Sequence, residues 1–242
     1  QMIDELASDC NDIAALIGYP CPSSQPSGRA LYNTVAFCNQ EQVQDRRFKS
    51  LLPTYDVFDE HRYFEPAGAI AAYEPLMYQN IALGISICED LWNDQQLMDR
   101  QLYHQDPIQS LIDQGAQLLI NCSASPYVLA KHDFRLKLFA SIASRHQIPL
   151  IYCNQVGGND DLIFDGQSTI VDSKGRSWAQ ARAFQEDLLV VDTTQEPQAG
   201  KNWPSSEIEN IHDALVLGIS DYFAKLKMDS AIVALSGGID SA

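Results

Sequence analysis

Apolar and polar residues follow two different periods along most of this 242-residue chain. Strict alternation predicts strands, whereas apolar residues spaced three and four positions apart predict helices. The first pattern predicts strands over 13–20, 31–38, 79–88, 116–125, 148–158 and 188–194, and a hairpin over 168–177. The second predicts helices over 1–12, 106–115 and 132–147. Strands and helices in this order predict a layered α/β domain, in which Pro20 ends the first strand.

The strand predicted over 79–88 ends on a cysteine that two acids and a tryptophan follow at once. Because side chains alternate between the faces of a strand, its residues divide into two sets. These sets are Ile81, Leu83, Ile85 and Ile87 on one face, and Gly84, Ser86 and Cys88 on the other.

The C-terminal part of the chain changes character. Residues 195–205 are polar and contain two prolines and a glycine, which predicts a linker. Ser206 and Glu209 then form a capping-box pattern at the start of a helix. The apolar stripe of that helix is Ile208, Ile211, Leu215, Ile219 and Phe223. Residues 230–242 predict a short strand that leads into a glycine-rich turn. We therefore expect one domain over 1–194 and the truncated beginning of a second over 206–242.

Composition narrows the possible partners. The chain carries 16 Lys and Arg against 32 Asp and Glu, a net charge of −16. Such a field repels phosphate backbones and anionic lipids, so we expect neither nucleic acid nor a membrane surface as a main partner. No apolar run approaches the roughly 20 residues that cross a bilayer, and no signal peptide is visible.

The six cysteines are scattered, without a C-x-x-C pair, and the five histidines do not cluster near them. This spacing argues against a zinc site. An even number of cysteines is compatible with disulfides. In a chain of this length without an export signal, we instead expect reduced thiols and a cytoplasmic protein.

Cys88 is the first candidate for chemistry. A thiol at the C-terminal end of a strand can point into a cleft, but its reactive form, the thiolate, requires a cation or a base nearby. Glu89 and Asp90 repel a thiolate, although one of them could anchor a substrate's ammonium group. The alternative is that Cys88 is a packed core thiol.

Two further segments carry candidate residues. The first contains Lys49 and is followed by an aromatic and acidic loop over 53–60, where a lysine could stabilise a forming oxyanion. The second, over 121–131, offers serine hydroxyls at a strand end and a lysine near a helix start. The alternatives are a mixed-charge surface loop and a strand-to-helix loop with capping serines. Together with Cys88 they predict one pocket at the strand ends.

Residues 236–241, Ser-Gly-Gly-Ile-Asp-Ser, lack the Gly-Lys-Ser/Thr ending of a P-loop. A glycine-rich turn before a helix can still hold a pyrophosphate through backbone N–H groups.

Four segments and this turn, in this order, resemble the glutamine-dependent NAD synthetase family, a branch of the nitrilase superfamily. They are 49–68, 84–92, 121–131, 154–168 and 235–242. The resemblance implies a nitrilase-like αββα sandwich, incomplete at its N-terminus. The first helix and strand of a Rossmann-like adenine-nucleotide α-hydrolase domain would follow.

The resemblance also implies roles for individual residues. Cys88 matches the nucleophile, Lys49 the catalytic lysine and Glu60 a supporting carboxylate. The general-base glutamate is expected upstream of 13–20 and is absent, and Glu5 is no substitute by position. The glutamine-binding positions correspond to Tyr55, Phe58, Glu89, Ser125 and Lys131. The ATP-binding positions correspond to Ser236, Gly237, Gly238, Asp240 and Ser241, with Asp240 also a possible Mg²⁺ ligand.

The implied activity is release of ammonia from L-glutamine, without a cofactor. The ammonia would serve the ATP- and Mg²⁺-dependent amidation of nicotinic acid adenine dinucleotide to NAD⁺ in a homo-oligomeric full-length enzyme. We expect the 242-residue chain itself to be inactive. The alternatives are another nitrilase-type carbon-nitrogen hydrolase, or a folded piece that serves only in binding or assembly.

Overall fold

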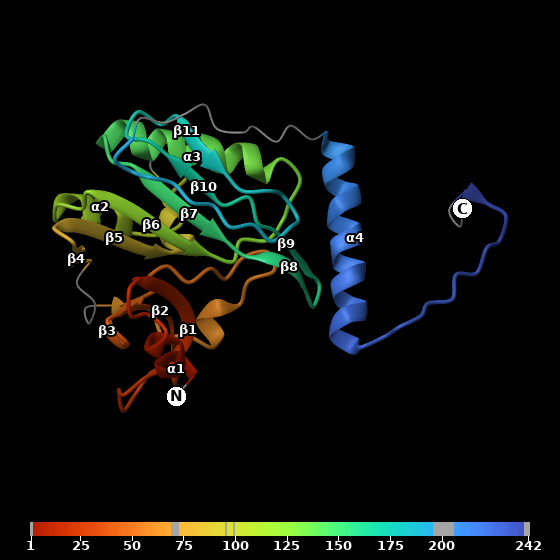
Figure 1. Cartoon of the computed structure of the whole chain (residues 1–242), viewed down its shortest axis with the longest axis horizontal. Coiled ribbons are helices and arrows are strands. Elements are labelled where there is room, and N and C mark those ends of the chain that lie inside the picture. The colour runs from red at the N-terminus through yellow and green to blue at the C-terminus, as the bar shows by residue number, and fades with distance from the viewer. Residues whose placement is uncertain (1, 69–72, 95, 99, 196–205, 240–242) are drawn as a thin grey trace.

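The computed structural model describes residues 2–68, 73–94, 96–98, 100–195 and 206–239 (Figure 1). The helices are α1 (Met2–Ser8), α2 (Pro107–Asp113), α3 (Lys131–His146) and α4 (Glu207–Leu226), with short 3₁₀ turns η1 (Glu60–Arg62) and η3 (Cys88–Leu91). The strands are β1 (Ala15–Pro22), β2 (Leu31–Asn39), β3 (Gln42–Phe48), β4 (Leu76–Tyr78), β5 (Ile81–Ile87), β6 (Leu118–Ser123), β7 (Leu150–Asn154), β8 (Val156–Asn159), β9 (Leu162–Asp165), β10 (Thr169–Val171) and β11 (Ser177–Gln180).

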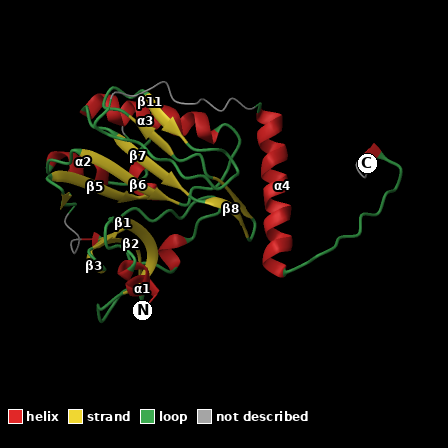
Figure 2. Ribbon diagram, viewed as in Figure 1, coloured by secondary structure: helices red, strands yellow, loops and turns green. Residues whose placement is uncertain are grey.

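Two sheets form the body of the molecule (Figure 2). The larger has the order β11-β10-β7-β6-β5-β4, and its central strands β5, β6 and β7 run parallel. The smaller is an antiparallel meander in the order β1-β2-β3. Since the carboxyl ends of β5, β6 and β7 lie at one edge, the residues that follow these strands are brought together there.

Three apolar clusters show that the layers are helix, sheet, sheet and helix. The cluster between the larger sheet and helices α2 and α3 includes Leu111, Leu119, Leu138, Phe139 and Tyr152. The cluster between the two sheets consists of Val35, Phe37, Leu76, Leu83, Ile85 and Ile87. The cluster between the smaller sheet and α1 consists of Ala7, Cys10, Ala36 and Cys38. The predicted αββα sandwich is therefore the observed fold.

The first strand is longer than predicted. We expected Pro20 to end it, but β1 continues to Pro22, and the two prolines pair with Asn33 and Leu31 of β2. β1 lies at the edge of its sheet, where a residue without an N–H group is tolerated because the other side of the strand has no ladder to complete.

Two predicted strands do not form. Residues 188–194 have no strand structure, and Leu188 and Val190 are exposed. Residues 230–235 are extended coil, in which Ile232 is fully exposed. Each segment has strand-like side chains, but within the described residues neither has a neighbouring strand to pair with, and pairing supplies most of a strand's stability. The linker expected over 195–205 falls outside the described residues after Gln195.

Helix α4 lies beside the β8–β9 hairpin (Figure 1). It begins with the predicted capping box, in which Ser206 accepts the N–H of Glu209 at 3.2 Å and Glu209 accepts the N–H of Ser206 at 2.7 Å. Asp221 accepts the N–H of Gly158 at 2.6 Å. Most of the predicted apolar stripe nevertheless remains exposed, as Ile208 and Ile219 illustrate. Among the described helices, none is long and apolar enough to cross a membrane.

Gly84 in β5 is required by close packing. A Cβ atom at this position would lie 2.8 Å from Leu119 Cδ2 and 3.0 Å from Ala116 Cβ, and the alanine has no rotamer through which to move away. A Cβ atom added to Gly18 in β1 would have no neighbouring atom within 4 Å.

We predict that Gly84→Ala lowers the free energy of unfolding by about 1–3 kcal/mol, because it overfills the core beneath β5. Gly18→Ala is the matched control and should change it by less than about 0.5 kcal/mol. Urea denaturation followed by circular dichroism measures both, and equal effects of the two substitutions would contradict the packing explanation.

Candidate active site

Cys88 lies immediately after β5, where the backbone leaves the strand. Its φ of +43° is in the left-handed region, which a residue other than glycine adopts at a cost of about 1–2 kcal/mol. The strand alternation therefore stops at Ile87, and the prediction that Cys88 shares a face with Gly84 and Ser86 was wrong. Cys88 instead packs against the cluster between the two sheets, which contains Ile85 and Ile87.

Asp90 connects the turn at Cys88 to the segment that follows Lys49. Its Oδ1 accepts the N–H groups of Ser50 at 3.0 Å and Leu51 at 2.8 Å, and its Oδ2 accepts the N–H of Ile87 at 3.1 Å. Burial raises the pKa of Asp90 to about 6, although the three N–H donors and Lys49 oppose this. Asp90 is thus a structural clamp and not the ammonium anchor.

Lys49 follows β3 and is 3% exposed. Its Nζ forms an ion pair with Glu60, whose Oε1 accepts the Nδ2–H of Asn33 at 2.6 Å. Burial lowers the pKa of Lys49, but Cys88 in its ionised form, together with Glu60 and Asp90, outweighs burial and holds the pKa above its usual range. Lys49 therefore presents a permanent positive charge at neutral pH.

A cleft of about 820 Å³ opens between the two sheets at this edge. Among its lining residues are four that the sequence predicted for the site, namely Lys49, Phe58, Glu60 and Cys88. The ends of β3, β5 and β6, which bear Lys49, Cys88 and Ser123, thus meet in one pocket, as expected. Ser123 and Asn154 at the ends of β6 and β7 complete this side of the cleft.

Glu89 is 4% exposed and is held by two phenols. Its Oε1 accepts the hydroxyl hydrogens of Tyr55 at 2.8 Å and of Tyr103 at 3.0 Å. Burial raises the pKa of Glu89, and these hydrogen bonds oppose the rise. Tyr55 was predicted for the site, whereas Tyr103 was not. It lies in a polar stretch without periodicity, and nothing in the sequence connects it to Glu89.

Four predicted glutamine-binding residues do not line the cleft, namely Tyr55, Glu89, Ser125 and Lys131. Ser125 is buried, and its N–H donates to Asn154 Oδ1 at 2.9 Å. Lys131 begins α3, and its Nζ lies 5.3 Å from the ring centre of Trp92. Burial and the positive charge of Arg135 lower the pKa of Lys131. Their predicted contact with glutamine remains a prediction.

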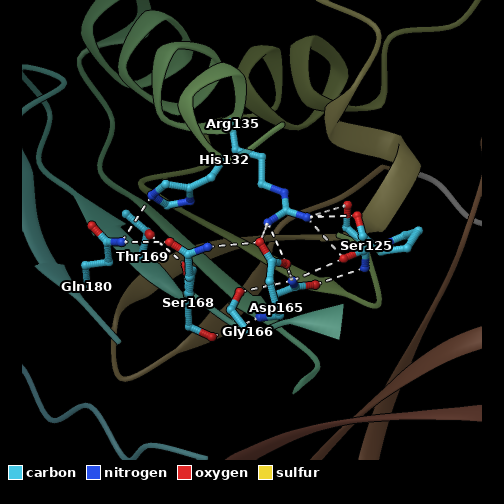
Figure 3. A network of polar contacts seen from close by, with 11 residues as sticks. Ser125, His132, Arg135, Asp165, Gly166, Ser168, Thr169 and Gln180 are labelled. Carbon is cyan, nitrogen blue, oxygen red and sulfur yellow. Dashed lines mark hydrogen bonds and ion pairs between the residues drawn. The ribbon is translucent and has the colours of Figure 1, made fainter. Parts of the chain in front are cut away.

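A buried polar network supports this side of the cleft (Figure 3). Arg135 Nη1 donates to both oxygens of Asp165, at 2.9 and 2.8 Å, and each of the two side chains is 1% exposed. Arg135 Nη2 donates to the carbonyl and hydroxyl oxygens of Ser125 at 3.1 and 3.2 Å. Asn154 Nδ2 donates to Asp165 Oδ1 at 3.3 Å and to the Gly166 carbonyl at 3.0 Å. The network fixes the loop after β6 relative to Asn154.

The family model for carbon-nitrogen hydrolases matches residues 2–199. The chain belongs to the carbon-nitrogen hydrolase family.

Relatives of this carbon-nitrogen hydrolase agree with the resemblance seen in the motifs. It is 44% identical over 237 residues to the glutamine-dependent NAD(+) synthetase of Synechocystis sp., across 95% of this chain and 42% of that protein. It is 35% identical over 248 residues to that of Xylella fastidiosa strain 9a5c, across 99% of this chain and 42% of that protein. The chain therefore spans 42% of the length of these curated relatives.

A solved structure is similar over the whole chain. It is the glutamine-dependent NAD⁺ synthetase from Acinetobacter baumannii in complex with ADP, with a TM-score of 0.86 and 29% identity. The match covers 100% of this chain and 43% of that one. The similarity includes the C-terminal segment, where Gly237 has a φ of +82° and Gly238 donates its N–H to Ser236 Oγ at 3.3 Å. Asp240 and Ser241 lie outside the described residues.

The electrostatics of this carbon-nitrogen hydrolase predict the reactivity of its thiol. Burial raises the pKa of Cys88, Lys49 lowers it, and Glu89 and Glu60 raise it. Because the net shift is upward, the thiol stays protonated at neutral pH unless a base removes its proton.

We predict that alkylation of Cys88 by iodoacetamide increases with pH only above the usual thiol range, and that Lys49→Met moves the increase to still higher pH. Peptide-level mass spectrometry separates Cys88 from the other cysteines. Lys174→Met, which removes an exposed lysine, is the control and should leave the profile unchanged. An identical profile for wild type and Lys49→Met would contradict the assigned influence of Lys49.

Arg135→Met should lower the free energy of unfolding by about 3–5 kcal/mol, because it leaves the Asp165 carboxylate buried without its partner. Arg62→Met, which removes an exposed pair with Asp59, should cost less than about 1 kcal/mol. Chemical denaturation measures both changes. Equal costs would show that the buried pair does not support the fold in this way.

Proposed function

We propose that this chain is the glutamine-hydrolysing part of a glutamine-dependent NAD(+) synthetase. The observation that carries the proposal is the position of Cys88, on a left-handed turn at a strand end, in one cleft with the Lys49–Glu60 ion pair. The names of the relatives support the same substrate.

In the proposed reaction, the Cys88 thiolate attacks the side-chain amide carbon of L-glutamine after a base takes the thiol proton. The carbonyl π bond opens, and its electrons form an oxyanion that Lys49 and a backbone N–H beside Cys88 stabilise. The C–N bond then breaks, and the amide nitrogen leaves as ammonia once it has received a proton. Water hydrolyses the resulting glutamyl thioester, which gives glutamate and regenerates the thiol.

The proposal assigns substrate contacts to the residues around the cleft. Glu89 would pair with the α-ammonium group of glutamine, which accounts for an acid beside a nucleophilic cysteine. Tyr55 and Phe58 would cover the substrate from their loop, with ring centres 5.8 Å apart. Ser125 would contribute from the loop after β6, and Lys131 from the first residue of α3.

The ammonia would serve an ATP-dependent amidation of nicotinic acid adenine dinucleotide to NAD⁺ in the longer enzyme. The turn at Ser236, Gly237 and Gly238 supports a phosphate-binding role, because its backbone is exposed and Gly237 adopts a conformation that favours glycine. The ADP bound to the Acinetobacter baumannii relative agrees with this role. A Mg²⁺ contact from Asp240 belongs to the same proposal.

The setting proposed for the enzyme is the cytoplasm, where thiols stay reduced, and all six cysteines are free. The net charge of −16 supports small molecules over nucleic acid or membranes as partners. Homo-oligomerisation of the longer enzyme is part of the proposal. Hydrolysis of another amide is the alternative within the family. The turn at 236–238, which follows the cleft-bearing domain in the sequence, favours the synthetase.

The 242-residue chain should release little or no ammonia from L-glutamine. Of the two carboxylates that raise the pKa of Cys88, Glu60 is paired with Lys49 and Asn33, and Glu89 would pair with the ammonium group of glutamine, so neither of these two is left to take the thiol proton. A coupled glutamate dehydrogenase assay measures ammonia, with Cys88→Ala as the blank. Release that Cys88→Ala abolishes would show that the chain is catalytically sufficient.

In the longer enzyme, Cys88→Ala should abolish NAD⁺ synthesis from glutamine and leave synthesis from ammonium salts unchanged. The thiol is needed only to release ammonia, whereas free ammonia bypasses that step. Liquid chromatography of NAD⁺ formed with each nitrogen source tests this. Loss of both activities would contradict the assignment of two separate sites.

A further inference from the structure

The described residues between η3 and α2, within 92–106, include a side chain that contacts Glu89. This side chain is Tyr103, whose hydroxyl lies 3.0 Å from Glu89 Oε1. Glu89 follows Cys88 directly in the sequence, so Tyr103 contacts the residue next to Cys88. No step of the proposed glutamine hydrolysis involves Tyr103.

The two phenols bind Glu89 asymmetrically. Tyr55 and Tyr103 both donate to Oε1, and none of the described residues donates to Oε2. A carboxylate with one oxygen held by two donors keeps a fixed orientation, and its second oxygen is available to a cation. The two hydrogen bonds also favour the charged form of a carboxyl group whose burial raises its pKa.

Tyr103 is itself held in position by the backbone around it. Asn93, which is 3% exposed, donates from Nδ2 to the carbonyl oxygens of Tyr103 at 3.0 Å and Gln105 at 2.7 Å. Tyr73 donates its hydroxyl hydrogen to Gln105 Oε1 at 3.0 Å. The two bonds from Asn93 hold the loop backbone at Tyr103 and Gln105, whereas Tyr73 contacts only the side chain of Gln105. The position of Tyr103 therefore depends on neither Tyr73 nor a bound ligand.

We propose that Tyr103 is a positioning residue of the substrate site, which orients Glu89 so that Oε2 receives the α-ammonium group of an amino-acid amide. The inference rests on the proposed glutamine hydrolysis. Tyr103 does not touch the substrate and acts through Glu89. It makes the site selective for amides that carry an ammonium group, because Tyr103 keeps the carboxylate in one orientation, with Oε2 unoccupied by a donor from the described residues.

Binding of L-glutamine to the 242-residue chain tests this role. All variants carry Cys88→Ala, so that turnover cannot interfere. Isothermal titration calorimetry should show that Tyr103→Phe raises the Kd for L-glutamine about tenfold, as expected for the loss of a hydrogen bond to a charged group. Tyr73→Phe is the matched control, because it removes a phenol that bonds the same loop without contacting Glu89, and it should leave the Kd unchanged.

A double-mutant comparison separates positioning from general stabilisation of the loop. In a Glu89→Gln background, Tyr103→Phe should have no further effect on the Kd, because the charge that it orients is already gone. Carbon NMR of Glu89 without ligand supplies a second readout, in which Tyr103→Phe raises the pKa of Glu89 and Tyr73→Phe does not.

The possible outcomes are distinct. An unchanged Kd in Tyr103→Phe, or the same loss in the Glu89→Gln background, would overturn the role of Tyr103 while leaving glutamine as the substrate. If the parent chain binds no L-glutamine, the proposed substrate itself is wrong, and this role for Tyr103 falls with it.

Discussion

The Asp90 carboxylate is the contact on which the site depends. It joins Ser50 and Leu51, which follow Lys49, to Ile87, which precedes Cys88. Three N–H groups from two segments about 40 residues apart in sequence thus meet on one side chain that is 3% exposed. Burying a charge is costly unless donors surround it, so the arrangement is stable only when both segments are in place. The same contact brings Lys49 into the cleft with Cys88.

Around this clamp, each acidic group has a different environment and therefore a different task. Asp90 accepts three backbone N–H groups, Glu60 pairs with Lys49, and Glu89 accepts two phenol hydrogen bonds that oppose the rise of its pKa on burial. The charge of Lys49 opposes the effect of burial on Cys88, but it does not by itself produce a thiolate at neutral pH. The thiol therefore stays protonated at neutral pH unless a base removes its proton.

Behind the cleft, the Arg135–Asp165 pair connects α3 to the end of β9 and to the loop after β6. Most hydrogen-bonding groups of Arg135 and Asp165 bond to one another, to Ser125 or to Asn154. The pair therefore makes the loop after β6 rigid, at the cost of removing two charges from water. Rigid support of this kind explains why the loop that bears Ser125 can border the cleft without relying on the cleft for its shape.

The pattern of the sequence predicted a layered α/β domain and the approach of Cys88, Lys49 and Phe58 at strand ends, because periodicity and strand ends are local properties. The αββα layers and the place of Glu60 followed only from the resemblance of the motifs to a known family. The pattern overestimated two strands, at 188–194 and 230–235, since local pattern cannot supply a pairing neighbour. Only the tertiary structure decided that Cys88 turns away from the face of Gly84, that Asp90 is a clamp, and that Tyr103 reaches Glu89. These features depend on one positive φ angle and on hydrogen bonds between distant segments, which leave no periodic trace in the chain.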